Sequence, residues 1–274
     1  MLLRSLILCG ALLSPMLAGA SVPLRLDHGV VFIDVTVDGR GPFAFILDPG
    51  AGDTITQDTL RRLGLAAGAE TAEVELAIGD AQLGKLTLPV FPGDGRGLYP
   101  KHDPAGPPIA GTLGPDLLKR FALRVDYAGA ALTLTPLETF NYGGHGTALP
   151  LVFHDVIPLV EASADGISGL FAYDLRAPGA MLLFHPFLER NGFLERYHTH
   201  PDAAHPMLPV TLHELAIAGV TLQDQPARFG GFSEGKFAVA DEAGVLGHDV
   251  LSQFVTTIDY RHHVIYFEPV TRHP

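Results

Sequence analysis

The chain has 274 residues, of which 30 are Asp or Glu and 18 are Lys or Arg, so its formal net charge is −12. A surface of this charge repels nucleic acids and anionic membranes, and we expect neither as a partner. The length suffices for one large or two small domains with a buried core. Because Gly (31) and Pro (22) are abundant and helical heptads are absent, the composition predicts a mostly-β protein with many tight turns.

The first 20 residues have the pattern of a secretory signal peptide. Arg4 precedes an apolar stretch, and Ala18-Gly19-Ala20 has the small residues of a cleavage site. The apolar stretch is short for a membrane span, and an uncleaved N-terminal anchor is the alternative. The only cysteine, Cys9, lies within this segment. We therefore expect a periplasmic or secreted protein that has no disulfide and no membrane attachment once the signal is removed.

Two segments, one in the middle of the chain and one near its C-terminus, resemble each other. Residues 113–136 read LGPDLLKRFALRVDYAGAALTLTP, and residues 246–269 read LGHDVLSQFVTTIDYRHHVIYFEP. Aligned without gaps, eight of the 24 positions are identical. Such self-similarity indicates an internal duplication and predicts a pseudo-twofold axis.

The copies extend upstream to two aspartates. VDGRGPFAFILD (37–48) aligns with ADGISGLFAYD (164–174) with one gap. In each segment a D-G turn leads from an alternating strand into an apolar strand, which ends at Asp48 or Asp174. Related by a twofold axis, these two carboxylates would face each other.

Between the aspartate and the repeated Leu-Gly turn, both halves carry the same succession of elements. A short helix is predicted at 59–65 and at 187–193, with Gly64 or Gly192 as the residue that closes it. A hairpin is predicted after each helix, at 74–88 in the first half and at 210–222 in the second. The sequence thus predicts four segments: a signal peptide at 1–20, an N-terminal lobe at 21–136, a linker at 137–150 and a C-terminal lobe at 151–274.

Two facing carboxylates indicate acid–base chemistry. Within hydrogen-bond distance they share one proton, because both cannot readily ionise together. One then serves as the general base for a water molecule and the other as the general acid. Such a pair hydrolyses peptide bonds without a metal or cofactor, and neighbouring glycines allow the backbone to approach it closely.

With these residues, the sequence resembles aspartic proteases of the pepsin and retropepsin type, most closely two-lobed bacterial proteins built from tandem retropepsin-like domains. The resemblance spans roughly 25–270 and implies two pseudo-symmetric acid-protease-like β-barrel lobes with short helices. It implies Asp48 and Asp174 as the catalytic dyad. The residues that it implies as support for the dyad are Pro49, Gly50, Leu175, Arg176, Leu113, Gly114, Leu246 and Gly247.

The sequence departs from the family's Asp-Thr/Ser-Gly motif in both lobes. Pro49 and Leu175 replace the residue whose hydroxyl braces the dyad in that family, and Pro49 has no N–H. The glycine of the motif is kept as Gly50 but is replaced by Arg176 in the second lobe. A guanidinium next to Asp174 is expected to pair with it and to oppose a shared proton.

Two functions therefore follow from the resemblance. The first is an aspartic endopeptidase that cleaves extended polypeptides and assembles its dyad within one chain, which predicts a monomer. The alternative is an inactive pseudoprotease that binds extended peptides at the same place. The substrate-covering flap of the family would correspond by position to 91–108, and in the second lobe to 228–236.

Three other patterns suggest different roles. Asp126 and Asp259 also repeat, but each precedes a tyrosine at a hairpin, which indicates turn structure. GFSEG around Ser233 matches the G-x-S-x-G motif without the strand and helix that a serine hydrolase needs. His198, His200 and His205, near Asp202, could bind zinc, although solvated loop histidines are more common.

Overall fold

The computed structural model describes residues 19–66, 68–99, 106–232, 235 and 239–270. Strands contain 52% of the residues and helices 10%, and the strands close into two six-stranded barrels. The prediction of a mostly-β, two-lobed barrel fold with short helices is therefore confirmed. The predicted signal peptide falls largely outside the described residues, and Ala20, its last residue, begins the first strand.

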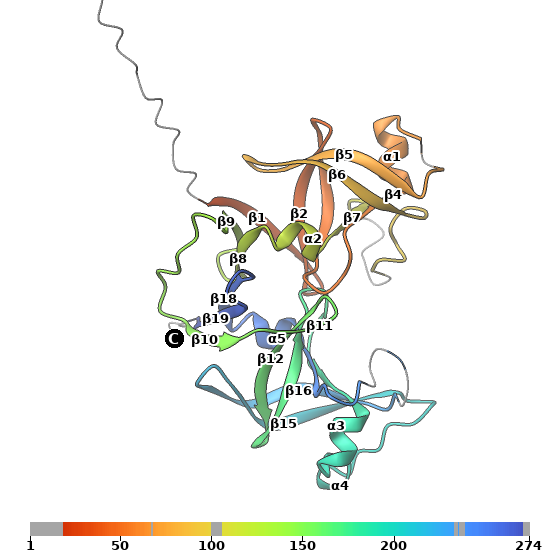
Figure 1. Cartoon of the computed structure of the whole chain (residues 1–274). Coiled ribbons are helices and arrows are strands. Elements are labelled where there is room, and N and C mark those ends of the chain that lie inside the picture. Colours follow the sequence, from red (N-terminus) through yellow and green to blue (C-terminus); the bar gives the residue numbers. More distant parts are fainter. Residues whose placement is uncertain (1–18, 67, 100–105, 233–234, 236–238, 271–274) are drawn as a thin grey trace, which may run out of the picture.

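The lobe-one barrel follows the strand order β2-β3-β7-β4-β6-β5, and β5 closes it by pairing with β2 (Figure 1). Its elements are β2 (Val30–Val37), β3 (Arg40–Leu47), β4 (Thr54–Thr56), α1 (Gln57–Leu63), β5 (Thr71–Ile78), β6 (Ala81–Phe91), β7 (Ile109–Leu113) and α2 (Pro115–Leu118).

The lobe-two barrel repeats this order as β12-β13-β17-β14-β16-β15, closed by β12. Its elements are β12 (Ile157–Ala164), β13 (Ile167–Tyr173), β14 (Met181–Leu183), α3 (His185–Arg190), α4 (Phe193–Arg196), β15 (Met207–Ile217), β16 (Val220–Gly230), β17 (Gly244–Leu246) and α5 (His248–Leu251). The short β11 (Val152–His154) pairs with the start of β12.

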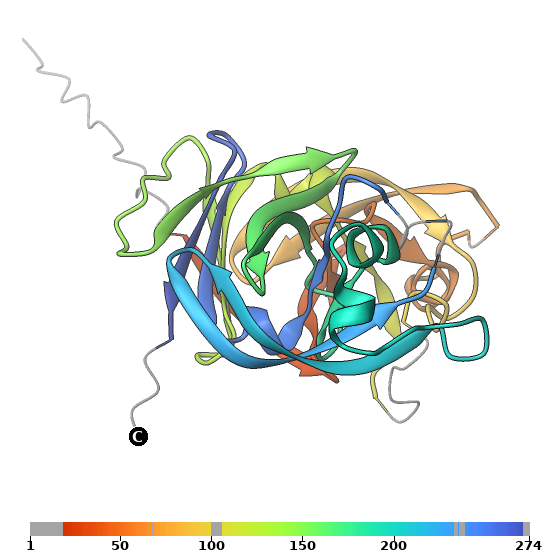
Figure 2. The same cartoon turned by 90° about the horizontal axis from the view of Figure 1, so that it is seen from below.

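A third group of strands joins the lobes in the order β10-β19-β18-β8-β9-β1. Figure 2 shows this shared sheet to one side of both barrels. Its strands are β1 (Ala20–Asp27), β8 (Phe121–Asp126), β9 (Ala131–Pro136), β10 (Thr147–Pro150), β18 (Phe254–Asp259) and β19 (Val264–Pro269). The end of the predicted linker at 137–150 is thus a strand of this sheet.

The pairing of β8 with β18 has the symmetry that the duplication predicts. Arg124 pairs with Thr257, which is its own counterpart in the repeat. On either side, Leu123 pairs with Ile258, which is the counterpart of Val125 in the repeat. In the same way Val125 pairs with Thr256, the counterpart of Leu123. The pseudo-twofold axis therefore passes between Arg124 and Thr257.

Local sequence explains the turns that both lobes share. Asp38-Gly39 and Asp165-Gly166 have positive φ angles at both residues, which two-residue hairpin turns of this type require. Gly64 closes α1 in the left-handed conformation, as predicted. In lobe two the helix ends earlier than predicted, at Arg190, and Gly192 instead begins α4.

Candidate functional site

Each predicted aspartate follows the last residue of a buried central strand. In lobe one, β3 runs parallel to β7 with Leu47 opposite Leu113, and the Asp48 N–H donates to the Leu113 carbonyl at 3.0 Å. In lobe two, β13 runs parallel to β17 with Tyr173 opposite Leu246. The Leu-Gly turn of each lobe therefore lies next to its aspartate turn. Asp48 is buried, whereas Asp174 is partly exposed.

The two aspartate turns have the same internal hydrogen bond. The Gly50 N–H donates to Asp48 Oδ1 at 2.9 Å, and the Arg176 N–H donates to Asp174 Oδ1 at 2.7 Å. In both lobes the donor is the second residue after the aspartate. The missing N–H of Pro49 therefore costs this turn no hydrogen bond, because the residue directly after the aspartate is not the donor in either lobe.

Glycine is required in both Leu-Gly turns because another backbone approaches it closely. A Cβ on Gly114 would lie 1.8 Å from the Ala51 carbonyl oxygen, and one on Gly247 would lie 2.5 Å from that of Gly179. Both distances are far below any real van der Waals contact. The glycine that both halves have in this turn is thus required by backbone packing at the base of the site.

A second carboxylate, which the sequence did not indicate, fixes the lobe-one turn. Buried Asp53 accepts the Gly114 N–H through Oδ1 at 2.6 Å and the Leu117 N–H through Oδ2 at 3.1 Å. Burial raises its pKa, while these two hydrogen bonds act in the opposite direction. Its one sequence signal is a second aspartate in the glycine-rich segment that follows Asp48.

Lobe two fixes the corresponding turn with backbone carbonyls. The N–H groups of His248 and Asp249, at the start of α5, donate to the carbonyls of Ala177 and Gly179, each at 3.0 Å. The turn around Arg176 is therefore anchored through its backbone, and it needs no counterpart of Asp53.

Arg176 makes an ion pair across the two lobes. Its Nε lies 3.1 Å from Oδ2 of Asp48, whose side chain is 2% exposed, compared with 30% for Arg176. The expectation that this guanidinium pairs with the neighbouring Asp174 is wrong: its backbone N–H binds Asp174, and its side chain reaches the opposite lobe. The arginine side chain is long enough to cross to the other lobe, where it meets the carboxylate of Asp48 inside lobe one.

Two further contacts bring the turns of the two lobes together. The Val31 N–H of β2 donates to the Leu175 carbonyl at 3.2 Å. A Cβ at Gly50 would lie within van der Waals range of Ile157, at the start of β12. The ion pair between Asp48 and Arg176 is therefore part of a packed interface between the lobes.

Buried tyrosines surround the two turns. Burial raises the pKa of Tyr127 and of Tyr260, the tyrosines that follow the repeated Asp126 and Asp259. The charge of Asp174 adds to the shift of the Tyr127 pKa, and the charge of Asp48 to that of Tyr260. Each repeated tyrosine thus lies in the electrostatic field of the aspartate of the other lobe and stays uncharged.

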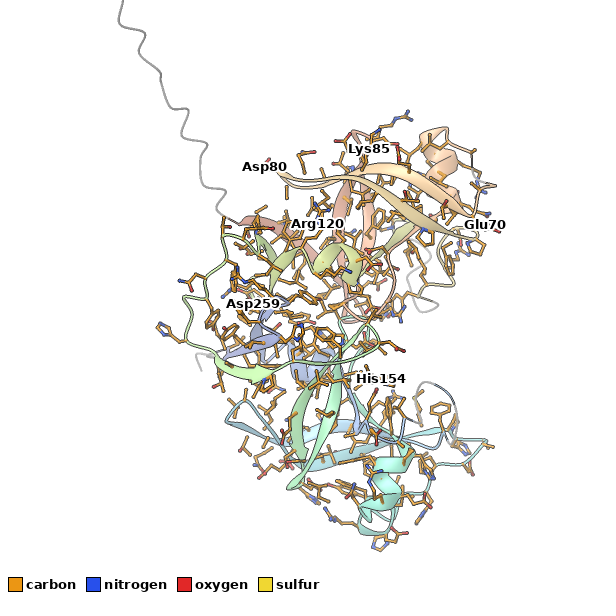
Figure 3. All side chains as sticks on the ribbon, in the orientation of Figure 1. Glu70, Asp80, Lys85, Arg120, His154 and Asp259 are labelled. Carbon is orange, nitrogen blue, oxygen red and sulfur yellow. The ribbon has the colours of Figure 1, made fainter. Side chains whose placement is uncertain are left out.

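Asp126 and Asp259 are turn residues, as the sequence indicated. Asp126 Oδ1 accepts the Gly129 N–H at 2.7 Å. Asp259, labelled in Figure 3, accepts the N–H groups of Arg261 and His262 at 3.0 and 3.2 Å. These carboxylates organise the hairpin turns of the shared sheet.

The segments predicted as flaps are described only in part. In the first, Tyr99 packs with Phe32 and Ile46 on the face of β2 and β3 that is turned away from the main core, and residues 100–105 lie outside the described residues. The second overlaps the end of β16, and Ser233 of the GFSEG motif also lies outside the described residues.

The histidine-rich loop does not form a metal cluster in the part of the chain that the structure describes, where no group of three potential ligands occurs. His205 Nδ1 lies 3.5 Å from Oδ1 of Asp202, three residues earlier in the same loop.

Comparison with models of known protein families and with curated proteins finds no match to this chain. Within the described residues, no helix is both long and apolar enough to cross a membrane.

Proposed function

We propose that the chain is a two-lobed pseudoprotease, which binds extended polypeptide where the two aspartate turns meet and does not hydrolyse it. The observation that carries this proposal is the ion pair between Arg176 and Asp48. The proposal follows the resemblance to two-lobed aspartic proteases for the location of the site, and it departs from that resemblance on catalysis. An active endopeptidase is the competing outcome.

The chemistry of an aspartic dyad explains why this ion pair opposes catalysis. The dyad requires one protonated and one ionised carboxyl group around a water molecule. A guanidinium next to Asp48 stabilises its ionised form, and the Gly50 N–H already donates to its other oxygen. A proton shared with Asp174 is therefore disfavoured. Pro49 and Leu175 also lack the hydroxyl that braces such dyads.

The same residues retain groups that bind a peptide backbone. Arginine has five N–H donors, and among the described residues the Arg176 side chain makes one ion pair, with Asp48, and no side-chain hydrogen bond. Asp174 is partly exposed, and its Oδ1 accepts a hydrogen bond from the Arg176 N–H. A guanidinium donor and a carboxylate acceptor next to each other complement the C=O and N–H of an extended chain.

A restoration series tests the loss of catalysis. We expect no cleavage of unfolded protein by the wild type, and pepstatin-sensitive cleavage only after Pro49→Thr, Leu175→Thr and Arg176→Gly are combined. Asp48→Asn in the restored protein is the control and should abolish that cleavage. Wild-type activity equal to that of the restored protein would contradict the proposal.

A further inference from the structure

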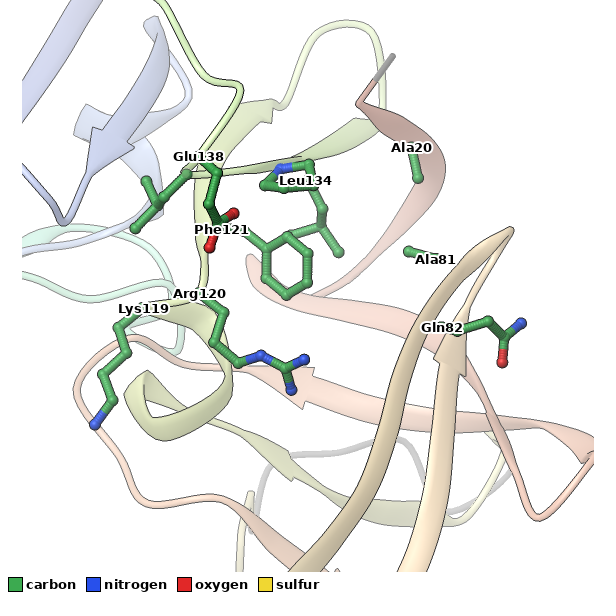
Figure 4. A pocket seen from close by; sticks show the side chains of 10 residues that line it. Ala20, Ala81, Gln82, Lys119, Arg120, Phe121, Leu134 and Glu138 are labelled. Carbon is green, nitrogen blue, oxygen red and sulfur yellow. The ribbon is translucent and has the colours of Figure 1, made fainter. Parts of the chain in front are cut away.

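Lobe one contains a cavity of about 380 Å³ that is separate from the aspartate turns (Figure 4). It lies between the start of β1, the turn of the β5–β6 hairpin, the start of β8 and the chain that follows β9. None of its lining residues belongs to the two aspartate turns. Its volume lies at the lower end of the range of about 300–1,000 Å³ for small-molecule sites, so it suits a small ligand.

The cavity combines an apolar surface with charges of both signs. Phe121, Leu134 and Leu137 contribute apolar surface, and Lys119, Arg120 and Glu138 contribute charged side chains. Arg120 and Glu138 come from adjacent chain segments, because the Leu137 N–H donates to the Arg120 carbonyl at 3.2 Å. Figure 4 shows both side chains around the Phe121 ring.

Arg120 is held in place and still has donors to offer. Its Nη1 donates to the Leu83 carbonyl at 2.9 Å, and its guanidinium lies 5.8 Å from the centroid of the Phe121 ring. Within the described residues its remaining N–H groups have no hydrogen-bond partner. The neighbouring Lys119 differs, because its Nζ is bound to Asp116 at 2.9 Å.

Glu138 is the other charge that lacks a partner. Within the described part of the chain it makes no ion pair, either with Arg120 or with any other cation. A cavity that presents one unpaired cation and one unpaired anion beside apolar surface complements a small zwitterion. We propose that this cavity binds a free apolar α-amino acid, with its carboxylate on Arg120, its ammonium group on Glu138 and its side chain against Phe121.

Calorimetric titration of the full chain with L-leucine tests this inference independently of the proposed peptide-binding function. N-acetyl-L-leucine lacks the ammonium group, and L-leucinamide lacks the carboxylate. Because each analogue loses a hydrogen bond between charged groups, we expect it to bind at least about tenfold more weakly than leucine.

Variants assign each charge to its residue. Arg120→Gln should remove the preference for leucine over leucinamide, and Glu138→Gln the preference over N-acetyl-leucine. Lys85→Gln is the matched control, because Lys85 pairs with Glu73 outside the cavity, and it should change neither preference. Arg120→Lys keeps the charge and should weaken binding less than Arg120→Gln, which guards against a loss of fold. Absence of saturable leucine binding to the wild type, or equal binding of all three ligands, would overturn the inference.

Discussion

Arg176 of lobe two lies with its Nε 3.1 Å from Oδ2 of Asp48 in lobe one, so a buried carboxylate at the centre of the molecule is neutralised from the opposite lobe. Asp48 would otherwise carry its charge in a site that excludes water, because its side chain is 2% exposed. The buried charge of Asp48 in lobe one is therefore compensated only when lobe two holds Arg176 next to it.

Removal of the guanidinium should destabilise the protein. Because a buried charge loses its partner, we expect Arg176→Met to lower the free energy of unfolding by about 3 kcal/mol. Asp48→Asn should reduce that loss, and the double-mutant cycle should give a coupling of at least about 1 kcal/mol. Urea unfolding measures these values.

The exposed pair of Arg25 and Asp34 provides the control for this cycle, since its side chains are 43% and 53% exposed. Arg25→Met should change stability by less than about 1 kcal/mol. Equal effects of Arg176→Met and Arg25→Met would show that the pair across the lobes has no special role.

The Leu-Gly turns should not tolerate a side chain. Gly114→Ala places its Cβ 1.8 Å from the Ala51 carbonyl oxygen, and we expect a loss of about 3 kcal/mol or more, because a packed backbone must move. Gly247→Ala should cost less, since its Cβ meets the Gly179 carbonyl at 2.5 Å. Gly52→Ala, in the lobe-one turn, is the control because nothing lies within 4 Å of its Cβ. Thermal unfolding that ranks Gly52→Ala with Gly114→Ala would contradict this packing.

His248 should make the lobe interface sensitive to acid. Its ring packs edge-on against Tyr127, with centroids 5.1 Å apart, and next to Gly29. Burial lowers the pKa of His248, and the charge of Asp249 offsets this in part. The neutral His248 ring thus makes its full contribution to stability above the unfolded-state pKa of about 6.5. This contribution is lost as the pH falls through the lower folded-state pKa of His248.

Thermal unfolding of wild type and His248→Phe at several pH values checks this dependence. The wild type should lose more stability than the variant when the pH is lowered below about 6.5. An identical pH dependence of the two proteins would exclude His248 as its source.

His154 should show the opposite dependence. Its Nδ1 lies 2.5 Å from Oε1 of the buried Glu242, and this hydrogen bond raises the pKa of His154. Its contribution is therefore complete below about pH 6.5 and is lost as the pH rises through the folded-state pKa. An NMR titration should give a midpoint above about 6.5 for His154, and Glu242→Gln should lower it. A wild-type midpoint that Glu242→Gln leaves unchanged would contradict the pairing.

The duplicated sequence was sufficient to predict the two-lobed fold because repeated strands and turns obey local rules. The D-G turns and Gly64 have the conformations that their residue types favour. The partner of Arg176 could not be predicted in the same way. Its backbone position follows from the repeat, but the direction of its long side chain depends on how the two lobes pack.

Asp53 was missed for a related reason. Its hydrogen-bond partners, Gly114 and Leu117, lie about sixty residues away in the chain and no counterpart repeats in lobe two. The charges of the lobe-one cavity likewise come from segments that only the closed sheet brings together, as Arg120 and Glu138 show.

Binding and cleavage of one fluorescent unfolded polypeptide by wild type and Asp48→Asn tests the central claim most directly. Anisotropy measures the affinity, and the intact mass of the polypeptide measures cleavage between about pH 3 and 7, where one carboxyl group of such a pair can be ionised and the other protonated. The account predicts that both proteins bind with the same affinity and leave the polypeptide intact. Cleavage by the wild type that Asp48→Asn abolishes would contradict it, as would the absence of binding by either protein.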